Sequence, residues 1–257
     1  MRPAKFPFLE HEGVLAFAHR GGLSGHPENT MEAFEAAVAQ GYRYLETDVH
    51  ATHDGVLLAF HDDRLDRLTD RQGYIADLDY AEVSKARIGG VYPIPRFDEL
   101  LASWPQARFN IDPKADRSVL PLVEILSAAG AIERVCVTSF SGRRTRYVRE
   151  AMGPGLCTGL GPLGTMRLRF SSWSGPLRGL WGGFAEGCAQ IPVEERGIPL
   201  ADRSLIDRAH EAGLQVHVWT IDDPAEMARL LDLGVDGLMA DRLDVLKMVL
   251  VERGLWA

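Results

Sequence analysis

Ionisable side chains gather in four short segments of the sequence, and each segment lies in or directly after an apolar run. The segments contain His19 and Arg20, Glu46 and Asp48, His61 and Asp62, and Asp112 and Lys114. Histidine can take up and release a proton near neutral pH, carboxylates bind hard cations, and arginine and lysine bind anions. Together these side chains could hold a metal ion beside an anionic substrate and transfer protons to and from it.

Glu46 and Asp48 are spaced to act as a pair. Residues two apart on a strand point to the same side, so the two carboxylates would lie together. Such carboxylates repel and raise each other's pKa, and a divalent cation relieves that repulsion; Asp112 could supply a third ligand. An isolated Glu-x-Asp is more often a solvated strand face. Here the recurrence of polar residues at successive strand ends favours a site, as do Gly21 and Gly22, which let the backbone approach a ligand.

The elements that would position these residues are short apolar runs separated by helical patterns, the rhythm of parallel βα units. The candidate strands are Leu15–Ala18, Tyr44–Val49, Val56–Phe60, Arg108–Ile111, Val135–Thr138, Leu156–Thr158, Cys188–Ile191, Gln215–Trp219 and Gly237–Ala240. Val56–Phe60 follows an Asp54-Gly55 turn with no room for a crossover helix, so we expect a hairpin-like extension there.

The other eight runs predict a (β/α)8 TIM barrel, with the short hairpin-like extension after its second strand. A length of 257 residues is close to that of one such barrel, so we expect a single domain over residues 1–257. Catalytic residues of these barrels gather at the carboxyl ends of the strands, where the four polar segments fall.

Local signals indicate some helices and one long loop. Asn29 is a candidate N-cap, with Glu32 three residues later, and Gly41 is placed to end that helix. Helical patterns also cover Ala201–Ala212 and Pro224–Leu233. The stretch Gly159–Gly187 is rich in Gly, Trp and Arg and is interpreted as a long loop.

The composition limits the possible partners and the compartment. The formal net charge is −8, so the field of the whole surface would repel nucleic acid, and a substrate anion needs a local positive pocket or a metal. No apolar stretch approaches the roughly 18 residues of a membrane span, and the amino terminus lacks the apolar core of a signal peptide. We expect a cytoplasmic protein, with its oligomeric state open.

Three cysteines, Cys136, Cys157 and Cys188, are widely separated, and each lies in a short apolar run. This pattern is typical of core thiols. An odd number without Cys-x-x-Cys spacing argues against a disulfide framework and against a structural zinc site, and it favours a reducing compartment.

The stretch Ala18–Asp70 carries, in order, an HRG, a PENT, a Glu-x-Asp, an Asp-Gly turn and a His-Asp. In this order it strongly resembles the glycerophosphodiester phosphodiesterase family. Further similar pieces are NIDPK (Asn110 to Lys114), VWT (Val218 to Thr220) and GVDGLMAD (Gly234 to Asp241). The resemblance covers most of the chain and is absent from about Arg143 to Ala189.

The resemblance implies a β/α barrel that hydrolyses glycerophosphodiesters to an alcohol and glycerol 3-phosphate with one divalent cation. By motif position, His19 and His61 would be the general acid and base, in an order left open. Glu46 and Asp48 would bind the metal, and Arg20 and Lys114 would contact the phosphate. A phosphodiester carries one negative charge and a poor alkoxide leaving group, so this set of residues suits its hydrolysis.

Three further residues have less specific roles. Asp112 stands where the family more often has Glu, so the choice between Mg²⁺ and Ca²⁺ is open. Glu28 is expected beside the substrate site, or else as a charge at a helix amino terminus. Trp219 could line the substrate pocket or fill the core, with about even weight.

The stretch Arg143–Arg178 is basic in an otherwise acidic protein. It carries seven arginines against one acidic residue, Glu150, with Phe170, Trp173, Leu177, Leu180 and Trp181 in or just after it. One interpretation is a lid or lipid-facing edge, giving peripheral lipid contact through residues 159–187. The other is a solvated loop that packs its aromatic rings over the barrel rim.

Two alternative functions follow. A lysophospholipase D or sphingomyelinase D-like phosphodiesterase would keep the metal site and act on lipid substrates, and both the aromatic stretch and Asp112 favour it. A barrel that only binds phosphoesters is disfavoured, because both histidines and all three carboxylates are present.

Overall fold

The computed structural model describes residues 4–23, 25–173 and 183–256 of the chain. The strands are β1 Leu15–Ala18, β2 Tyr44–Ala51, β3 Leu57–Ala59, β4 Arg87–Ile88, β5 Tyr92–Pro93, β6 Arg108–Pro113, β7 Val135–Val137, β8 Cys157–Thr158, β9 Cys188–Ile191, β10 Glu194–Glu195, β11 Ile198–Pro199, β12 Gln215–Val218 and β13 Gly237–Ala240. The α-helices are α1 Met31–Ala39, α2 Tyr80–Val83, α3 Phe97–Ser103, α4 Val119–Ala128, α5 Gly142–Met152, α6 Pro162–Trp173, α7 Arg203–Glu211, α8 Pro224–Leu233 and α9 Leu243–Glu252. The 3-10 helices are η1 Pro7–Leu9, η2 His19–Gly21, η3 Ile75–Asp77, η4 Asp116–Ser118 and η5 Ile132–Arg134.

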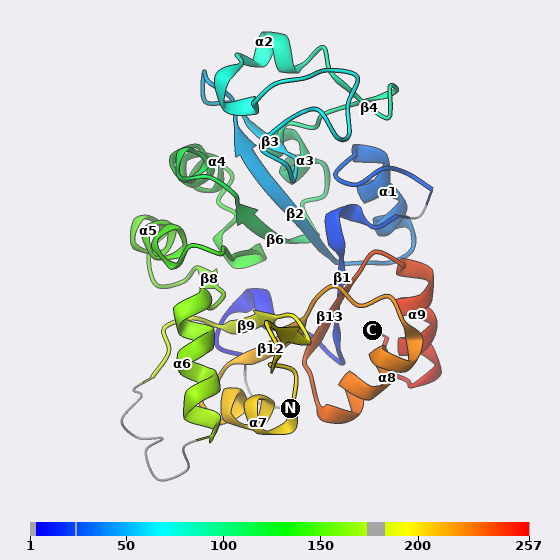
Figure 1. The fold of residues 1–257 in the computed structure, drawn as a ribbon, viewed down its shortest axis with the longest axis vertical. Helices are drawn as coiled ribbons and strands as arrows, with labels where there is room; N and C mark the ends of the chain where they lie inside the picture. The colour runs from blue at the N-terminus through cyan, green and yellow to red at the C-terminus, as the bar shows by residue number, and fades with distance from the viewer. Residues whose placement is uncertain (1–3, 24, 174–182, 257) are drawn as a thin grey trace.

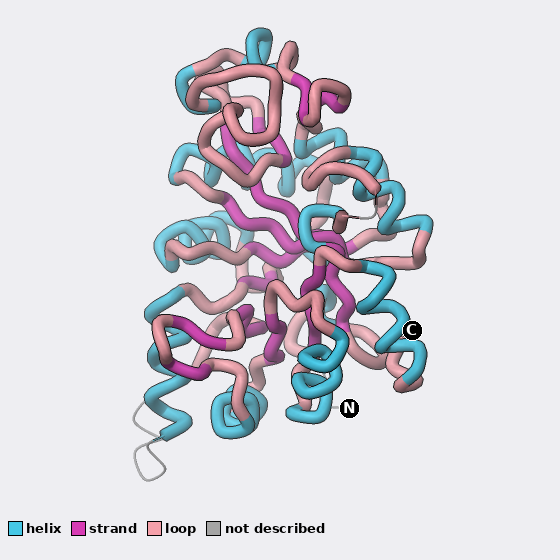
Figure 2. Tube along the Cα trace, turned by 45° about the vertical axis from the view of Figure 1, so that its right-hand side comes forward, coloured by secondary structure: helices cyan, strands magenta, loops and turns pink. Residues whose placement is uncertain are grey.

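Within the described residues, eight parallel strands form one sheet that curves into a nearly closed barrel. Their order is β8-β7-β6-β2-β1-β13-β12-β9, and a parallel bridge between Gly159 and Cys188 links the two end strands. There the backbone N–H of Leu160 donates to the carbonyl of Cys188 at 2.9 Å. Figure 1 shows the strands at the centre with the helices around them, and Figure 2 shows the same arrangement after a turn. The predicted (β/α)8 TIM barrel is confirmed.

The hairpin-like extension after the second strand is also present. β3 pairs antiparallel with β2, with Val49 opposite Ala59. The chain continues into a larger excursion with its own apolar cluster, which includes Phe60 and Ile75 and lies at the top of Figure 1, around α2. The backbone N–H of Phe60 donates to the carbonyl of Asp48 at 2.9 Å. The next residue of the chain, His61, is therefore held at the carboxyl end of β2.

The N-cap of α1 differs from the expected one. Thr30, rather than Asn29, is the cap: its hydroxyl accepts a hydrogen bond from the backbone N–H of Ala33 at 3.2 Å. Asn29 has a positive φ of 57°, and its Oδ1 accepts from the hydroxyl of Thr47 on β2 at 2.8 Å. Asn29 thus ties the first βα turn to the neighbouring strand, while the β-region backbone of Thr30 starts the helix.

The prediction of a long loop at Gly159–Gly187 is wrong for residues 162–173, which form α6. Packing against α7 explains this helix better than its sequence does. The guanidinium of Arg169, only 3% exposed, donates to Asp202 at 2.7 Å and to the hydroxyl of Ser204 at 2.6 Å. Tertiary contacts here override the weak helix propensity of a segment that contains Gly164.

The amino ends of the barrel strands are closed by η1. Phe8 is fully buried and meets Tyr44 edge-on at 5.4 Å between ring centres. Burying such a phenylalanine contributes ~2 kcal/mol. Arg108 donates to the carbonyl of Phe8 at 2.8 Å. η1 therefore covers the core at this end of the barrel, and the polar segments lie at the other end. Within the described part of the chain, no helix is both long and apolar enough to cross a membrane.

Candidate active site

The three carboxylates predicted as a set come from two neighbouring strands. Glu46 and Asp48 lie on β2, and Asp112 lies opposite Asp48 in the parallel register of β6. All three side chains are buried. Asp48 and Asp112 thus stand at the same level of the barrel, near the carboxyl ends of their strands.

Two cations are paired with this acidic set. The Lys114 Nζ lies 2.6 Å from Oδ1 of Asp48 and 2.9 Å from Oδ2 of Asp112. The Arg20 Nε lies 3.0 Å from Oδ2 of Asp48, and the Arg20 backbone N–H donates to Glu46 at 3.1 Å. Sequence reasoning grouped these residues correctly, since the structure brings Arg20, Lys114 and all three carboxylates together.

Burial and neighbouring charge shift the pKa values of the three carboxylates in different directions. Burial, followed by the charge of Asp48, raises the pKa of Glu46 to about 7. Burial alone would also raise the pKa of Asp48, but the charges of Lys114 and Arg20 outweigh it and lower this pKa below its usual value. At Asp112 the effect of burial prevails over Lys114, and the pKa is raised. Of the three, only Asp48 has a pKa below its usual value.

The donor set fits a hard divalent cation. It consists of carboxylate oxygens, and one of them, Oδ1 of Asp112, is buried without a hydrogen-bond partner, as expected where an ion supplies the missing interaction. Among the described residues, however, only the cysteines form a group of three ligand atoms within 4.8 Å of one another. In this structure Lys114 and Arg20 neutralise the carboxylates instead.

His19 is held beside this set by a carboxylate from the last strand. Its Nδ1 lies 2.8 Å from Oδ1 of Asp241, which follows β13, and its Nε2 lies 3.8 Å from Oε2 of Glu46. Burial lowers the pKa of His19, but the charge of Glu46 and the hydrogen bond to Asp241 outweigh this, so the pKa is raised. Asp241 fixes which ring nitrogen faces the carboxylates.

His61 has an equivalent carboxylate partner. Its Nδ1 lies 2.7 Å from Oδ1 of Asp62. Arg67 donates to Asp62 at 2.6 Å and to Glu28 at 2.8 Å, and Arg20 donates to Glu28 at 3.1 Å. The hydrogen bond from Arg67, more than that from His61, lowers the pKa of Asp62 to about 2. Glu28 therefore links the surroundings of the two histidines, consistent with its expected place beside the site.

A pocket of about 490 Å³ opens at this end of the barrel. Its lining residues are His50, His61, Asp62, Asp63, Arg64, Asp66, Arg67 and Lys114. A larger hollow of about 1280 Å³ lies at the opposite end, beside Leu9, Tyr44 and Arg108. Only the smaller pocket is lined by residues of the predicted site, His61 and Lys114.

Residues 19–245 match the glycerophosphoryl diester phosphodiesterase family. The chain belongs to this family. A relative from Mycobacterium tuberculosis, described as probable glycerophosphodiester phosphodiesterase 2, is 38% identical over 97% of this chain and 95% of its own. A human relative described as a lysophospholipase D is 27% identical over 92% of this chain and 88% of its own.

Solved structures agree on the fold. A protein from Silicibacter pomeroyi, described as a putative glycerophosphoryl diester phosphodiesterase, has a TM-score of 0.79 at 22% identity, covering 97% of this chain and 99% of that one. An Oleispira antarctica phosphodiesterase, solved with the product sn-glycerol-3-phosphate, has a TM-score of 0.74 at 22% identity, covering 93% and 97%. As a member of the glycerophosphoryl diester phosphodiesterase family, the chain is a phosphoric diester hydrolase.

Trp219 follows β12 and packs against the core, while its role beside the substrate stays a prediction. Its ring packs partly against the apolar cluster at the amino ends of the strands. It also meets the ring of Phe140 edge-on at 5.9 Å, and Phe140, which follows β7, is 68% exposed. The two residues thus form an aromatic pair with one exposed member.

The basic stretch is divided between two helices. Arg143 and Arg144 on α5 both pair with Asp116, and Arg169 on α6 is buried against α7. Phe170 and Trp173 on α6 are 46% and 55% exposed, with ring centres 5.9 Å apart. The remaining residues named in that interpretation lie outside the described residues: Leu177, Arg178, Leu180 and Trp181. Ion pairing on α5 leaves less free positive charge than the sequence suggested.

Sequence reasoning missed the partners of the histidines. Asp62 adjoins His61 in the chain and could have been found from the His-Asp pair itself. Arg67 had no distinguishing pattern. Asp241 was seen only as part of the GVDGLMAD motif, and its contact with His19 depends on barrel closure.

Proposed function

We propose that this chain hydrolyses glycerophosphodiesters to an alcohol and glycerol 3-phosphate by histidine acid-base catalysis with one divalent cation. The observation that carries the proposal is the matched arrangement of His19 and His61. Each places Nδ1 against a carboxylate, Asp241 or Asp62, at 2.8 and 2.7 Å. Both histidines lie at the carboxyl end of the barrel, with the cations and carboxylates between them.

The cation would be Mg²⁺ or Ca²⁺, held by Glu46, Asp48 and Asp112. The family is generally dependent on divalent metals, and the buried Oδ1 of Asp112, which has no hydrogen-bond partner, supports this ligand set. When bound, the ion neutralises negative charge on the phosphate oxygens. Arg20 and Lys114, which now neutralise the carboxylates, would then be available to contact the phosphate.

The two histidines divide the proton transfers. One accepts a proton at Nε2 from the attacking water as the new bond between oxygen and phosphorus forms. The other donates its Nε2 proton to the alcohol oxygen as the old phosphorus–oxygen bond breaks. Asp241 and Asp62 keep the other ring nitrogen protonated, so that Nε2 is the nitrogen that exchanges the proton. A substrate with a better leaving group distinguishes the acid from the base, since its departure needs no proton.

A second candidate is a lysophospholipase D activity on lipid substrates. The exposed Phe140, in contact with Trp219, favours it, since an acyl chain needs apolar surface near the site. A human relative carries that description. We propose this pair as the apolar contact of such a substrate. Peripheral lipid contact of residues 159–187 stays a prediction from the sequence.

An assay of product release across substrates tests both functions. Glycerol 3-phosphate would be measured with glycerophosphocholine, glycerophosphoethanolamine and glycerophosphoinositol, and choline release with lysophosphatidylcholine. We expect glycerol 3-phosphate from at least one glycerophosphodiester, abolished by EDTA and by Glu46→Gln. Choline release from lysophosphatidylcholine alone would establish the second function in place of the first. No release from any substrate would contradict both.

Two further proposals concern the whole chain. We propose that residues 1–257 fold as one domain, which limited proteolysis would test by the absence of a stable smaller fragment. The cytoplasmic location stays a prediction, and cell fractionation would test it.

A further inference from the structure

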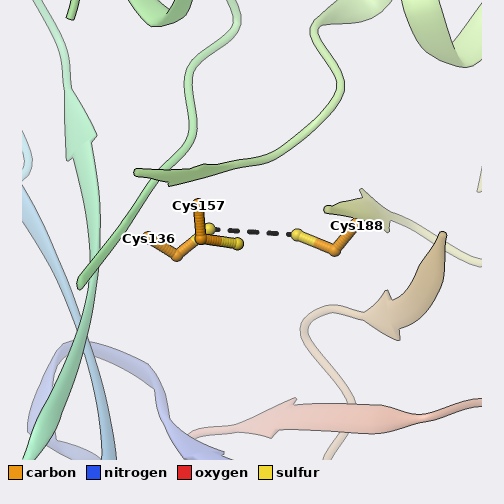
Figure 3. A group of neighbouring side chains, drawn as sticks. All are labelled: Cys136, Cys157 and Cys188. Carbon is orange, nitrogen blue, oxygen red and sulfur yellow. Dashed lines mark hydrogen bonds between the residues drawn. The ribbon is translucent and has the colours of Figure 1, made fainter. Parts of the chain in front are cut away.

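The three cysteines that are far apart in the sequence meet inside the barrel. Cys136, Cys157 and Cys188 lie on the neighbouring strands β7, β8 and β9, and Cys136 is directly opposite Cys157 in the parallel register. Their sulfur atoms all lie within 4.8 Å of one another, and those of Cys136 and Cys188 are 3.9 Å apart. Figure 3 shows the three side chains pointing toward one another from three strands.

The distance between two of these sulfurs matches that of ligands around one ion. Zinc binds a thiolate sulfur at about 2.3 Å, so two sulfurs of a tetrahedral site are separated by about 3.8 Å, and those of Cys136 and Cys188 are 3.9 Å apart. Thiolates are soft ligands, unlike the carboxylates at the other end of the barrel, and they select soft ions over Mg²⁺ or Ca²⁺.

The surroundings close the site tightly. The cysteines are at most 1% exposed, within a cluster that includes Phe6 and Leu9. Beside them, Gly187 has no room for a side chain: a Cβ there would lie 2.9 Å from the Cys157 sulfur. A closed, dry position of this kind suits a structural ion rather than a catalytic one, which keeps an open place for water or substrate.

A candidate fourth ligand comes from the strand beside β9. His217 on β12 is fully buried and stands in the register of Gln190, two residues after Cys188, although its ring nitrogens do not join the three sulfur atoms within 4.8 Å of one another. Its Nε2 is 3.2 Å from Oε1 of Gln215, which holds a proton on that nitrogen. Its Nδ1, 3.2 Å from the amide nitrogen of Gln190, is then the nitrogen with a lone pair. Exchange of that amide contact for an ion would complete a set of three cysteines and one histidine.

We propose that Cys136, Cys157 and Cys188, with His217 as the fourth ligand, form a buried structural site for Zn²⁺. The site is distinct from the catalytic carboxylates in position and in ligand chemistry, and the proposal does not depend on the reaction proposed above. The spacing of the cysteines along the sequence argued against structural zinc. In the folded barrel the three cysteines come from three neighbouring strands, so they can meet without being close together in the sequence.

The test is metal retention by the full chain. Protein without a histidine tag would be produced in zinc-supplemented medium, exchanged into metal-free buffer and analysed by mass spectrometry of its metal content. We expect the wild-type chain to retain one equivalent of zinc and to release it when a mercurial reagent modifies the thiols. Cys188→Ala should lose the zinc, and His217→Ala should retain it less firmly.

Matched control variants separate loss of a zinc ligand from loss of core packing and from loss of catalysis. Val137→Ala removes a buried neighbour on β7 without removing a thiol, and it should keep the zinc. Glu46→Gln should lose hydrolysis and keep the zinc, so the two proposals fail independently. Retention by His217→Ala equal to the wild type would exclude the fourth ligand.

Cobalt substitution covers the case in which a cysteine variant does not fold. The wild-type chain refolded with Co²⁺ should show the ultraviolet charge-transfer band of sulfur bound to cobalt. A folded, active wild-type chain that holds no zinc and shows no such band would overturn the proposal and leave three core thiols.

Discussion

Asp241 accepts a hydrogen bond from Nδ1 of His19 at 2.8 Å, although the two residues are 222 positions apart in the chain. The contact exists because β1 and β13 are neighbours in the closed barrel, with Ala18 opposite Ala240. The residues that follow these two strands therefore meet at the same end. We expect Asp241 to position His19 rather than to touch the substrate.

We expect Asp241→Asn to lower kcat by roughly 10²-fold, because an amide no longer selects the ring nitrogen that carries the proton. It should also shift the His19 limb of the pH profile to lower pH. The pKa of His19 is raised by Glu46 first and then by Asp241, so removing Asp241 lowers it. Rate profiles against pH with a glycerophosphodiester substrate would check both effects.

Asp236→Asn is the matched control for this variant. Asp236 holds His210 at the same distance, 2.8 Å, but neither residue lies near the carboxylates. It should leave kcat and the pH profile nearly unchanged at temperatures where the variant is folded. Equal effects of the two substitutions would show that Asp241 has only a structural role.

The strands and the central site could be predicted from the sequence because their signals are local. Apolar runs ending in Glu46-x-Asp48 or Asp112-x-Lys114 define both a strand and its catalytic end. The pairing of His19 with Asp241 and the meeting of the cysteines depend on which strands become neighbours. Which strands become neighbours is decided by closure of the barrel, and the spacing of residues along the chain does not predict it.

The helix signals that failed did so for tertiary reasons. α6 contains Gly164 and two serines, which weaken helix propensity, and it is stabilised by Arg169 inserted against α7. Asparagine often caps helices, but the side chain of Asn29 accepts a hydrogen bond from Thr47 instead. The next residue, Thr30, therefore caps the helix. In both cases a contact with a distant element overrides the local preference.

His19→Ala and His61→Ala should each lower kcat by about 10²-fold or more, the usual effect of removing a positioned proton-transfer group, with less effect on substrate binding. A substrate with a nitrophenyl leaving group needs no protonation as it departs. It should therefore partly rescue the variant that lacks the acid and not the one that lacks the base. Steady-state kinetics with both substrate types would assign the roles.

The control for the histidine variants is His53→Ala, which removes an exposed histidine on the turn after β2. It should retain wild-type activity with both substrates. Full activity in both His19→Ala and His61→Ala would exclude the proposed mechanism while leaving the fold unaffected.

Substitutions of Asp112 test whether this residue is a metal ligand or only a buried acid. Asp112→Asn should lose most of the activity, because a neutral amide binds a hard cation more weakly than a carboxylate. Asp112→Glu keeps the charge and should keep activity, with a changed ratio of rates in Mg²⁺ and Ca²⁺, since its longer side chain alters the space for the ion. Activity would be titrated with each ion after EDTA treatment. A wild-type enzyme that stays fully active in EDTA would refute the metal role.

Glu46 should make the metal-free chain less stable as the pH rises. Its pKa in the folded chain is about 7, against an ordinary value of 4.5. Below pH 4.5 it is protonated in both the folded and unfolded states, and above about pH 7 it is ionised in both. Between these limits only the folded state holds the proton, so the free energy of unfolding falls as the pH rises, by about 3 kcal/mol in total.

Urea unfolding in EDTA at a series of pH values would measure this decline. The raised pKa of His19 acts in the same direction, so the wild-type decline contains both contributions. Glu46→Gln cannot ionise and should be less steep between pH 4.5 and 7, with a higher free energy of unfolding at pH 7 than the wild type. Glu150→Gln, which replaces an exposed carboxylate on α5, should keep the wild-type slope. If Glu46→Gln and the wild type have the same slope in this range, Glu46 does not hold its proton in the folded chain, and its burial beside Asp48 must be relieved in some other way.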